Sequence, residues 1–114
     1  MAEDCIFCKI IKGDIPSTKV YEDDKMIAIN DVAPAAPVHV LLMPKDHTAN
    51  ITTADSELVA YMLGKVKMIA EKTGIAEKGF RVVINTGDEG GQTVKHLHIH
   101  VIGGKALGWP HAKP

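Results

Sequence analysis

The chain has 114 residues, of which 46% are hydrophobic, 24% charged and only 4% aromatic, and its formal net charge is -1. This length and composition predict a single domain, residues 1–114, with a core built from aliphatic side chains. The charge balance gives no basis for binding nucleic acid, no apolar run is long enough to cross a bilayer, and the acidic start lacks the pattern of a signal peptide. We therefore expect a cytoplasmic protein that binds neither nucleic acid nor membrane.

Two cysteines, Cys5 and Cys8, stand three residues apart near the start of the chain. Three interpretations are open for this pair: a redox couple, two buried structural thiols, or half of a zinc site that needs two further ligands. A redox couple normally follows a strand, and the sequence predicts no strand before this cysteine pair. The apolar residues over 6–11 have helical spacing and predict a short helix.

Three strands are predicted next. Residues 20–22 and 26–30 are expected to form a β-hairpin. The proline-rich stretch 33–37 cannot pair inside a sheet, because proline lacks an N–H, and is predicted to be a rigid connection. A further strand follows over 38–43 and ends at Pro44.

Two histidines in this region are unremarkable on their own. His39 is the only polar residue in its strand, which is typical of a core histidine whose hydrogen bonds are satisfied. His47 follows in a loop. Neither position alone indicates a site.

A long amphipathic helix is predicted after residue 53. Apolar residues recur three and four positions apart over 58–70, which gives the helix one buried face. Thr53 is the expected N-cap and Gly74 the expected C-cap. The apolar stripe is interpreted as core and not as a cofactor site.

A strand over 81–85 leads into a loop over 86–94 that contains three glycines and Thr93. Glycines let backbone N–H groups approach an anion closely, so the loop is a candidate for binding phosphate. It is not a P-loop, because the Gly-Lys-Ser/Thr signature is absent. A glycine-rich loop is common for conformational reasons alone, and the position beside the histidines described next strengthens the phosphate interpretation.

The segment over 96–102 alternates histidine with aliphatic residues. A strand has a side-chain period of two, so it would place His96, His98 and His100 on one face and turn Leu97, Ile99 and Val101 toward a core. Three imidazoles in a row are costly to bury without partners, which favours catalysis or metal binding over simple packing.

The alternating segment resembles the signature of the histidine triad family. The stretches 5–11, 31–39, 44–47, 90–94 and 108–110, together with Asn85, resemble the Hint branch of that family, and the likeness covers nearly the whole chain. It implies an α+β fold with an antiparallel sheet of about five strands, one long helix and a short N-terminal helix. It also implies a two-fold homodimer.

The resemblance implies a function as well: a purine nucleoside phosphoramidate hydrolase and nucleotidyl transferase that releases AMP or GMP. His98 would attack the α-phosphorus and form a nucleotidyl-histidine, which water would then hydrolyse. His100 would hold phosphoryl oxygens, His39 would fix the geometry of the histidine cluster, and Thr93 would help to protonate the leaving amine.

The nucleotide-binding residues implied by the resemblance fall into two groups. Asp31 would hold the ribose hydroxyls, and Phe7, Ile10, Ile29 and Val32 would enclose the base. The phosphate side would be formed by Asn85, Gly91, Gln92, Thr93 and Val94, with His98 and His100. Trp109 would reach the partner subunit's site and affect the choice of leaving group.

The resemblance also implies the two further ligands that a zinc site at the cysteine pair would need. In the version of the family with a C-x-x-C, the ligands here would be Cys5, Cys8, His47 and His96. Four ligands without an open position make a structural metal site and not a catalytic one. No organic cofactor is expected.

Two alternatives stay open. The three histidines of the alternating segment could instead hold a catalytic metal and its bound water. However, the first and last of three same-face positions on a strand are too far apart to bind one ion easily. The chain could also be a regulatory dimer that binds purine nucleotides without turnover.

Overall fold

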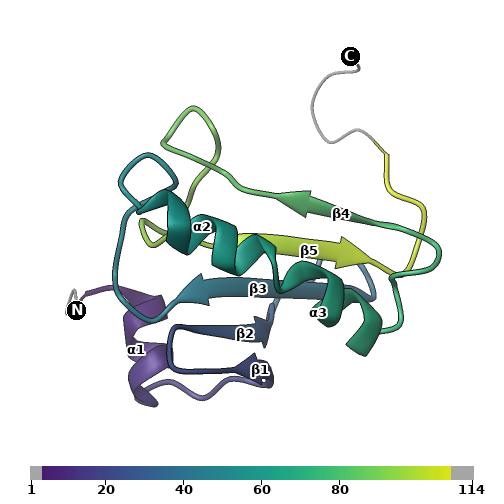
Figure 1. The fold of residues 1–114 in the computed structure, drawn as a ribbon, viewed down its shortest axis with the longest axis horizontal. Helices are drawn as coiled ribbons and strands as arrows, with labels where there is room; N and C mark the ends of the chain where they lie inside the picture. The colour runs from purple at the N-terminus through teal and green to yellow at the C-terminus, as the bar shows by residue number, and fades with distance from the viewer. Residues whose placement is uncertain (1–3, 109–114) are drawn as a thin grey trace.

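The computed structural model describes residues 4–108, which contain one five-stranded antiparallel sheet (Figure 1). The strands are β1 (Lys19–Glu22), β2 (Met26–Asn30), β3 (Val38–Pro44), β4 (Phe80–Val83) and β5 (Ile99–Gly103), in the spatial order β1-β2-β3-β5-β4. The last strand of the chain therefore lies between β3 and β4, each of which it pairs antiparallel. The predicted five-strand sheet is confirmed.

The two faces of the sheet carry different partners. Alternate residues of the central strands, including Val40, Leu42, Ile99 and Val101, pack against α2 (Ser56–Leu63) and α3 (Val66–Lys72). In Figure 1 these two helices follow one another across one face of the sheet. The opposite residues of the same strands, Ile27, Ile29, Leu41 and Met43, pack against α1 (Ile6–Lys12). The period of two along each strand thus sorts one sequence into two separate apolar clusters.

The predicted hairpin and the strand after the proline-rich connection are confirmed as β1, β2 and β3. The last two strands are shorter than predicted. β4 ends at Val83, so Asn85 lies in the loop that follows. β5 begins at Ile99, so His96 and His98 precede the strand and are not part of it. β5 pairs with β3 only from Val38 to Leu42, and before Ile99 the chain leaves the sheet and places His96 against Cys5 and Cys8 at the start of α1.

The helix predicted as one long element is divided into α2 and α3 by a turn at Gly64 and Lys65. Lys65 N–H bonds to the carbonyl of Met62, three residues back, and glycine contributes little helical preference at the break. The N-cap is also Asp55 and not Thr53, because the Asp55 carboxylate accepts from the N–H of Glu57. Gly74 follows the C-cap of α3, Thr73, with a φ of 80°.

Within the described part of the chain, neither length nor hydropathy equips any helix to span a membrane.

Candidate functional site

The histidines gather on the face of the sheet that α1 covers in part. In the register of the sheet, Leu41 pairs with His100, and His100 pairs with Val83. The next row on the same face runs from His39 through Ile102. The rings of His98 and His100 lie 4.9 Å apart, and those of His39 and His100 lie 5.2 Å apart. The histidines of the alternating segment therefore lie on one face, as predicted, although β5 itself begins only at Ile99.

The hydrogen bond of His98 fixes its tautomer. Its Nδ1 lies 2.7 Å from the backbone carbonyl of His96, and a carbonyl can only accept, so Nδ1 carries the proton. The Nε2 atom then holds a lone pair. The residue is buried, with 6% of its surface exposed, and the ring of Phe7 packs nearly perpendicular to it, with the ring centres 4.9 Å apart. This geometry gives a fixed, neutral imidazole with one nucleophilic nitrogen.

A second chain of hydrogen bonds fixes His39 and His100. The backbone N–H of Ala35 donates to Nδ1 of His39 at 3.0 Å, so the proton of a neutral His39 is on Nε2. That Nε2–H donates to Nδ1 of His100 at 2.9 Å. The proton of a neutral His100 is therefore on its own Nε2, where it can be donated to a ligand.

Burial keeps these rings uncharged. Desolvation lowers the pKa of His98, although its hydrogen bond to His96 and the charge of Asp31 act in the opposite direction. Desolvation also lowers the pKa of His100 to about 4, assisted by the neighbouring His98 and His39 and opposed by Asp31. Both imidazoles are thus neutral near pH 7.

A carboxylate lies beside this pair. Asp31 Oδ2 is 3.4 Å from His39 Nε2, while Asp31 Oδ1 accepts from the N–H of Ala33 at 2.9 Å. Asp31, His39 and His100 could in principle surround a cation. However, the Ala35 N–H holds the proton of His39 on the nitrogen that would have to bind it, so a metal there would have to displace that proton. This cluster is better described as a hydrogen-bond relay.

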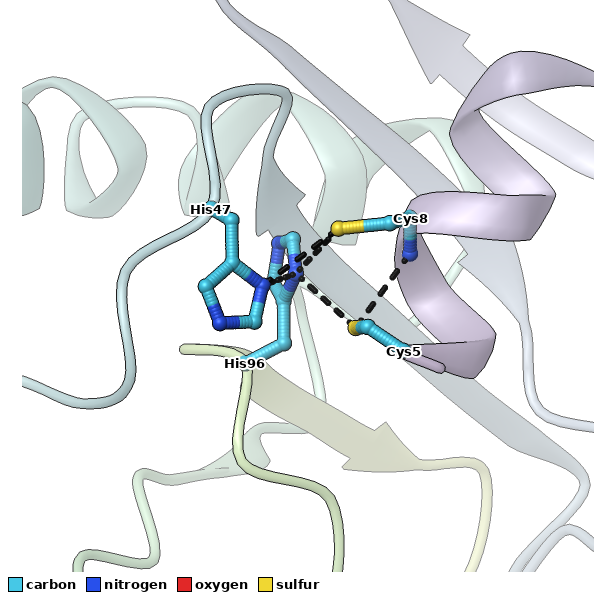
Figure 2. A group of neighbouring side chains, drawn as sticks. All are labelled: Cys5, Cys8, His47 and His96. Carbon is cyan, nitrogen blue, oxygen red and sulfur yellow. Dashed lines mark hydrogen bonds between the residues drawn. The ribbon is translucent and has the colours of Figure 1, made fainter. Parts of the chain in front are cut away.

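The other candidate ligands converge at the start of α1 (Figure 2). His96 donates from Nε2 to the carbonyl of Pro44 at 2.9 Å, which leaves its Nδ1 as an acceptor aimed at the cluster. That Nδ1 lies 3.4 Å from Cys5 Sγ, 3.6 Å from Cys8 Sγ and 3.1 Å from His47 Nδ1. All four ligand atoms lie within 4.8 Å of one another.

These separations suit a tetrahedral ion. Metal–sulfur and metal–nitrogen bonds of ~2.3 and ~2.0 Å imply ligand atoms roughly 3.3 to 3.8 Å apart. The separation of Cys8 Sγ and His47 Nδ1, 3.3 Å, falls in this range, as do both sulfur–His96 distances, and the 3.1 Å between the two Nδ1 atoms is just below it. Two thiols and two imidazoles can therefore hold one metal ion, and they use His96 for it. Among the described residues, neither group of candidate ligands contains more than one of His96, His98 and His100, which argues against the three sharing a catalytic metal.

The apolar residues predicted to enclose a base are partly assembled. Phe7 and Ile29 are buried in the cluster beneath α1, and Ile10 packs on it. Val32 is 95% exposed in the connection between β2 and β3. Phe7 therefore contacts His98 directly, while Val32 has no partner in the described part of this chain that would bury it.

The loop after β4 presents fewer free N–H groups than its sequence suggests. The N–H groups of Gly91 and Gln92 donate to the carbonyls of Asp88 and Gly87, at 3.1 Å each. Among residues 4–108, no partner is found for the N–H groups of Thr93 and Val94, so these two are available to an anion.

The side chain of Gln92 is buried and holds this loop together. It accepts from the N–H of Gly87 at 2.9 Å and donates to the carbonyls of Ala49 and Val94 at 2.7 and 3.0 Å. Asn85 similarly donates to the carbonyl of Gly90 at 2.8 Å. A Cβ at Gly90 would overlap the carbonyl of Thr86, so the turn requires glycine there. Both polar side chains therefore shape the loop.

A cavity of about 260 Å³ opens beside His39 and His100. Asn85, Val83 and Ile102 line it, together with Arg81, which the sequence analysis did not single out. The sequence could have drawn attention to Arg81, because it is the only arginine in the chain. The backbone groups that fix the tautomers, at Ala35, Pro44 and His96, carry no signal in the sequence. Trp109 lies outside the described residues.

Comparison with known proteins places this chain in a family. Over 113 residues, the chain is 54% identical to a HIT-like protein of Synechococcus elongatus, covering 96% of this chain and 98% of that one. It is 46% identical to a 14 kDa zinc-binding protein of Brassica juncea, covering 94% and 98%, and 46% identical to the adenylylsulfatase HINT1 of Arabidopsis thaliana, covering 92% and 74%.

Solved structures of the same family are similar to this chain in both fold and sequence. A histidine triad protein from Clostridium difficile superposes with a TM-score of 0.92 at 45% identity, covering 97% of this chain and 99% of that one. A HIT family hydrolase from Legionella pneumophila gives 0.89 at 44% identity, covering 94% and 98%. The family model for the HIT domain matches residues 12–107. The chain therefore belongs to the histidine triad family, as the alternating histidines and the stretches around them predicted.

Proposed function

We propose that this protein hydrolyses purine nucleoside 5′-phosphoramidates through a covalent nucleotidyl intermediate on His98, and releases AMP or GMP. The observation that carries the proposal is the hydrogen bond from His98 Nδ1 to the carbonyl of His96 at 2.7 Å. It leaves the Nε2 lone pair available for attack, and burial keeps the ring neutral. The names of relatives support this class of reaction: one is a HIT family hydrolase and another is an adenylylsulfatase.

The reaction proceeds in two steps. Nε2 of His98 attacks the α-phosphorus, the P–N bond to the leaving amine breaks, and its electron pair stays on the amine nitrogen, which takes up a proton. Thr93, whose hydroxyl lies on the adjoining loop, assists that protonation. Water then attacks the phosphorus, the phosphorus–His98 bond breaks, and the nucleoside monophosphate leaves. Dividing one displacement into two in this way is covalent catalysis.

Charge on the phosphoryl group is stabilised by fixed donors. The Nε2–H of His100 is held in place by its partner His39, and the N–H groups of Thr93 and Val94 supply two more donors. Donors that are already oriented cost no reorganisation when charge develops. Gly91, Gln92 and Asn85 act by holding the loop in this shape. Asp31 takes the ribose hydroxyls, and Phe7, Ile10, Ile29 and Val32 form the base side.

We also propose that the cluster of Cys5, Cys8, His47 and His96 binds structural zinc. Two sulfur and two nitrogen donors are a set that zinc commonly takes, and the name of the Brassica juncea relative supports that ion. When bound, zinc would tie the start of α1 to the segment that leads into His98. This role is structural, because all four positions around the ion are filled by the protein.

We further propose a homodimer formed along β4. β4 is an edge strand, and the side chains of Phe80 and Val82 are 36% and 39% exposed. Leu63, at the end of α2, is 43% exposed. Exposed apolar residues on an open strand edge favour pairing with a second copy.

The first prediction concerns the nucleophile. Mixed with adenosine 5′-phosphoramidate, the wild type should release AMP and gain one adenylyl group transiently in intact-protein mass spectrometry. His98→Ala should lose both, with a fall in turnover of about 10⁴-fold or more, because no other group can form the intermediate. Binding without adduct or turnover in the wild type would instead support the regulatory nucleotide-binding dimer.

The second prediction concerns pH. The folded-state pKa of His100 is about 4, below the ordinary value near 6.5, so the unfolded state takes up this proton first. His100 therefore destabilises the fold progressively as pH drops from about 6.5 toward 4. His100→Gln, whose amide oxygen can still accept from His39, should lose less stability than wild type between pH 7 and pH 5 in urea unfolding. Parallel curves for the two proteins would contradict this assignment, since acid effects at the metal ligands are common to both.

The third prediction concerns the metal. Elemental analysis should find one zinc per chain in the wild type and in Lys9→Gln, a control on the exposed side of α1. Cys8→Ser should bind zinc at least about tenfold more weakly and melt at a lower temperature, because a structural ion stabilises the folded state by binding to it. Chelation should lower the melting temperature while the folded protein keeps its AMP release. Loss of activity with unchanged melting would identify a catalytic metal.

The fourth prediction concerns assembly. Val82→Asp should convert the dimer to a monomer in light scattering, because it places a charge on the apolar edge. Val32→Asp, at an exposed apolar position away from β4, should remain a dimer. A wild type that is monomeric at micromolar concentration would rule the interface out.

A further inference from the structure

The two cysteines of the chain form a close pair whose chemistry the proposed reaction does not use. Both lie in the described part of the chain, and no disulfide joins them. Cys5 is the N-cap of α1, and its Sγ accepts from the N–H of Cys8 at 3.4 Å. The two sulfurs lie within 4.8 Å of one another, and both side chains point toward the same two imidazoles (Figure 2). A disulfide of ~2.05 Å would therefore require the sulfurs to approach by roughly 3 Å or less.

The two sulfurs differ in their access to solvent. Cys5 lines a cavity of about 350 Å³, together with His47, Thr93 and Lys95. Cys8 does not line this cavity, and only 1% of its surface is exposed. A small solute that enters the cavity therefore meets Cys5 before it can meet Cys8.

A metal ion at this site would prepare both sulfurs for oxidation. A cysteine that coordinates a metal is deprotonated, and the thiolate is the form that reacts with oxidants. Zinc has no redox chemistry of its own, so any electrons that the site loses come from sulfur. Oxidation of the sulfurs also removes the thiolate charges that bind the ion, so the site cannot be oxidised and keep its metal.

We propose that Cys5 and Cys8 are an oxidisable pair, which hydrogen peroxide converts to a disulfide with release of the ion. The inference rests on the structural zinc proposed above and does not involve the nucleophile. First, the Cys5 thiolate attacks the peroxide: an S–O bond forms, the O–O bond breaks and hydroxide leaves, which gives a sulfenic acid. The Cys8 thiolate then attacks the Cys5 sulfur: the S–S bond forms, the S–O bond breaks and a second hydroxide leaves. The sulfurs supply the two electrons that the peroxide takes up.

Oxidation changes which parts of the chain are joined. The four-ligand site connects the start of α1 to His47 and to His96, which come from separate loops. A disulfide between Cys5 and Cys8 connects only two residues of the first turn of α1. The oxidised protein should therefore be less stable than the zinc-loaded protein. The hydrogen bond of His98 does not involve either sulfur, so the folded oxidised protein should still release AMP.

The test treats zinc-loaded wild type with hydrogen peroxide. The intact mass should fall by two hydrogen atoms, one zinc per chain should pass to a colorimetric chelator, and the melting temperature should fall. Dithiothreitol with added zinc should restore all three. Peptide mapping should locate the new bond between Cys5 and Cys8. Peroxide that leaves the zinc bound, or that produces sulfinic acid without a disulfide, would overturn the proposal.

Two matched variants test which sulfur reacts first. Cys5→Ser and Cys8→Ser each remove one ligand and leave one thiol. Cys8→Ser should accumulate a sulfenic acid that dimedone traps, whereas Cys5→Ser should be labelled about tenfold more slowly, because Cys8 is enclosed. Equal labelling would overturn Cys5 as the first site of oxidation. Lys9→Gln, which removes no ligand, should release zinc as wild type does.

AMP release is measured in the same samples, so that the proposals are judged separately. A wild type that binds no zinc before oxidation overturns the zinc site and this inference together, and leaves the nucleophile untested by neither result, since AMP release reports on it directly. Zinc binding without disulfide formation under peroxide overturns only the present inference.

Discussion

The hydrogen bond between the ring of His98 and the backbone carbonyl of His96 is the contact on which the site depends. At 2.7 Å it determines which nitrogen of His98 carries the proton, and therefore which nitrogen can act as a nucleophile. The carbonyl belongs to the residue whose own side chain points to the two cysteines. His96 thus fixes the tautomer of the proposed nucleophile with its backbone, and its imidazole belongs to the candidate metal site.

This shared residue couples the candidate metal site to the candidate nucleophile. Cys5 and Cys8 flank Phe7 in sequence, and the ring of Phe7 forms T-shaped contacts with the rings of both His96 and His98. An ion held by the cluster would therefore position the start of α1, the aromatic wall and the backbone of His96 together. Since α1 has only seven residues, it is too short to be stable without such contacts. The structural role proposed for zinc follows from this arrangement more than from the ligand set alone.

Much of this arrangement could be predicted from the sequence, because it follows from periodicity. The period of two placed His98 and His100 on one face with Leu97, Ile99 and Val101 on the other, and the structure confirms this division. The bounds of β5 and the break in the helix could not be predicted in the same way, since they depend on which strand residues find partners and on one glycine at position 64. The tautomers depend on backbone atoms, which every residue possesses, and the loop that closes over Gln92 depends on tertiary contacts. Arg81 was visible in the sequence as a lone arginine, but only the sheet register connects it to the histidines.

The chemistry of the buried face explains how four neighbouring histidines can be accommodated near one core. Burying a charged imidazole is expensive, whereas a neutral one needs only a partner for its N–H. Protein groups accept from His39, His96 and His98, and the one ring whose Nε2–H is left for a ligand is His100. Asp31, the carboxylate at the relay, has one oxygen bound to the backbone and the other beside His39, and its charge partly offsets the lowering of the pKa of His98 and His100. Each buried ring therefore has a partner for its N–H except His100, whose Nε2–H is left for a ligand, which is the pattern expected of a binding site and not of a packing defect.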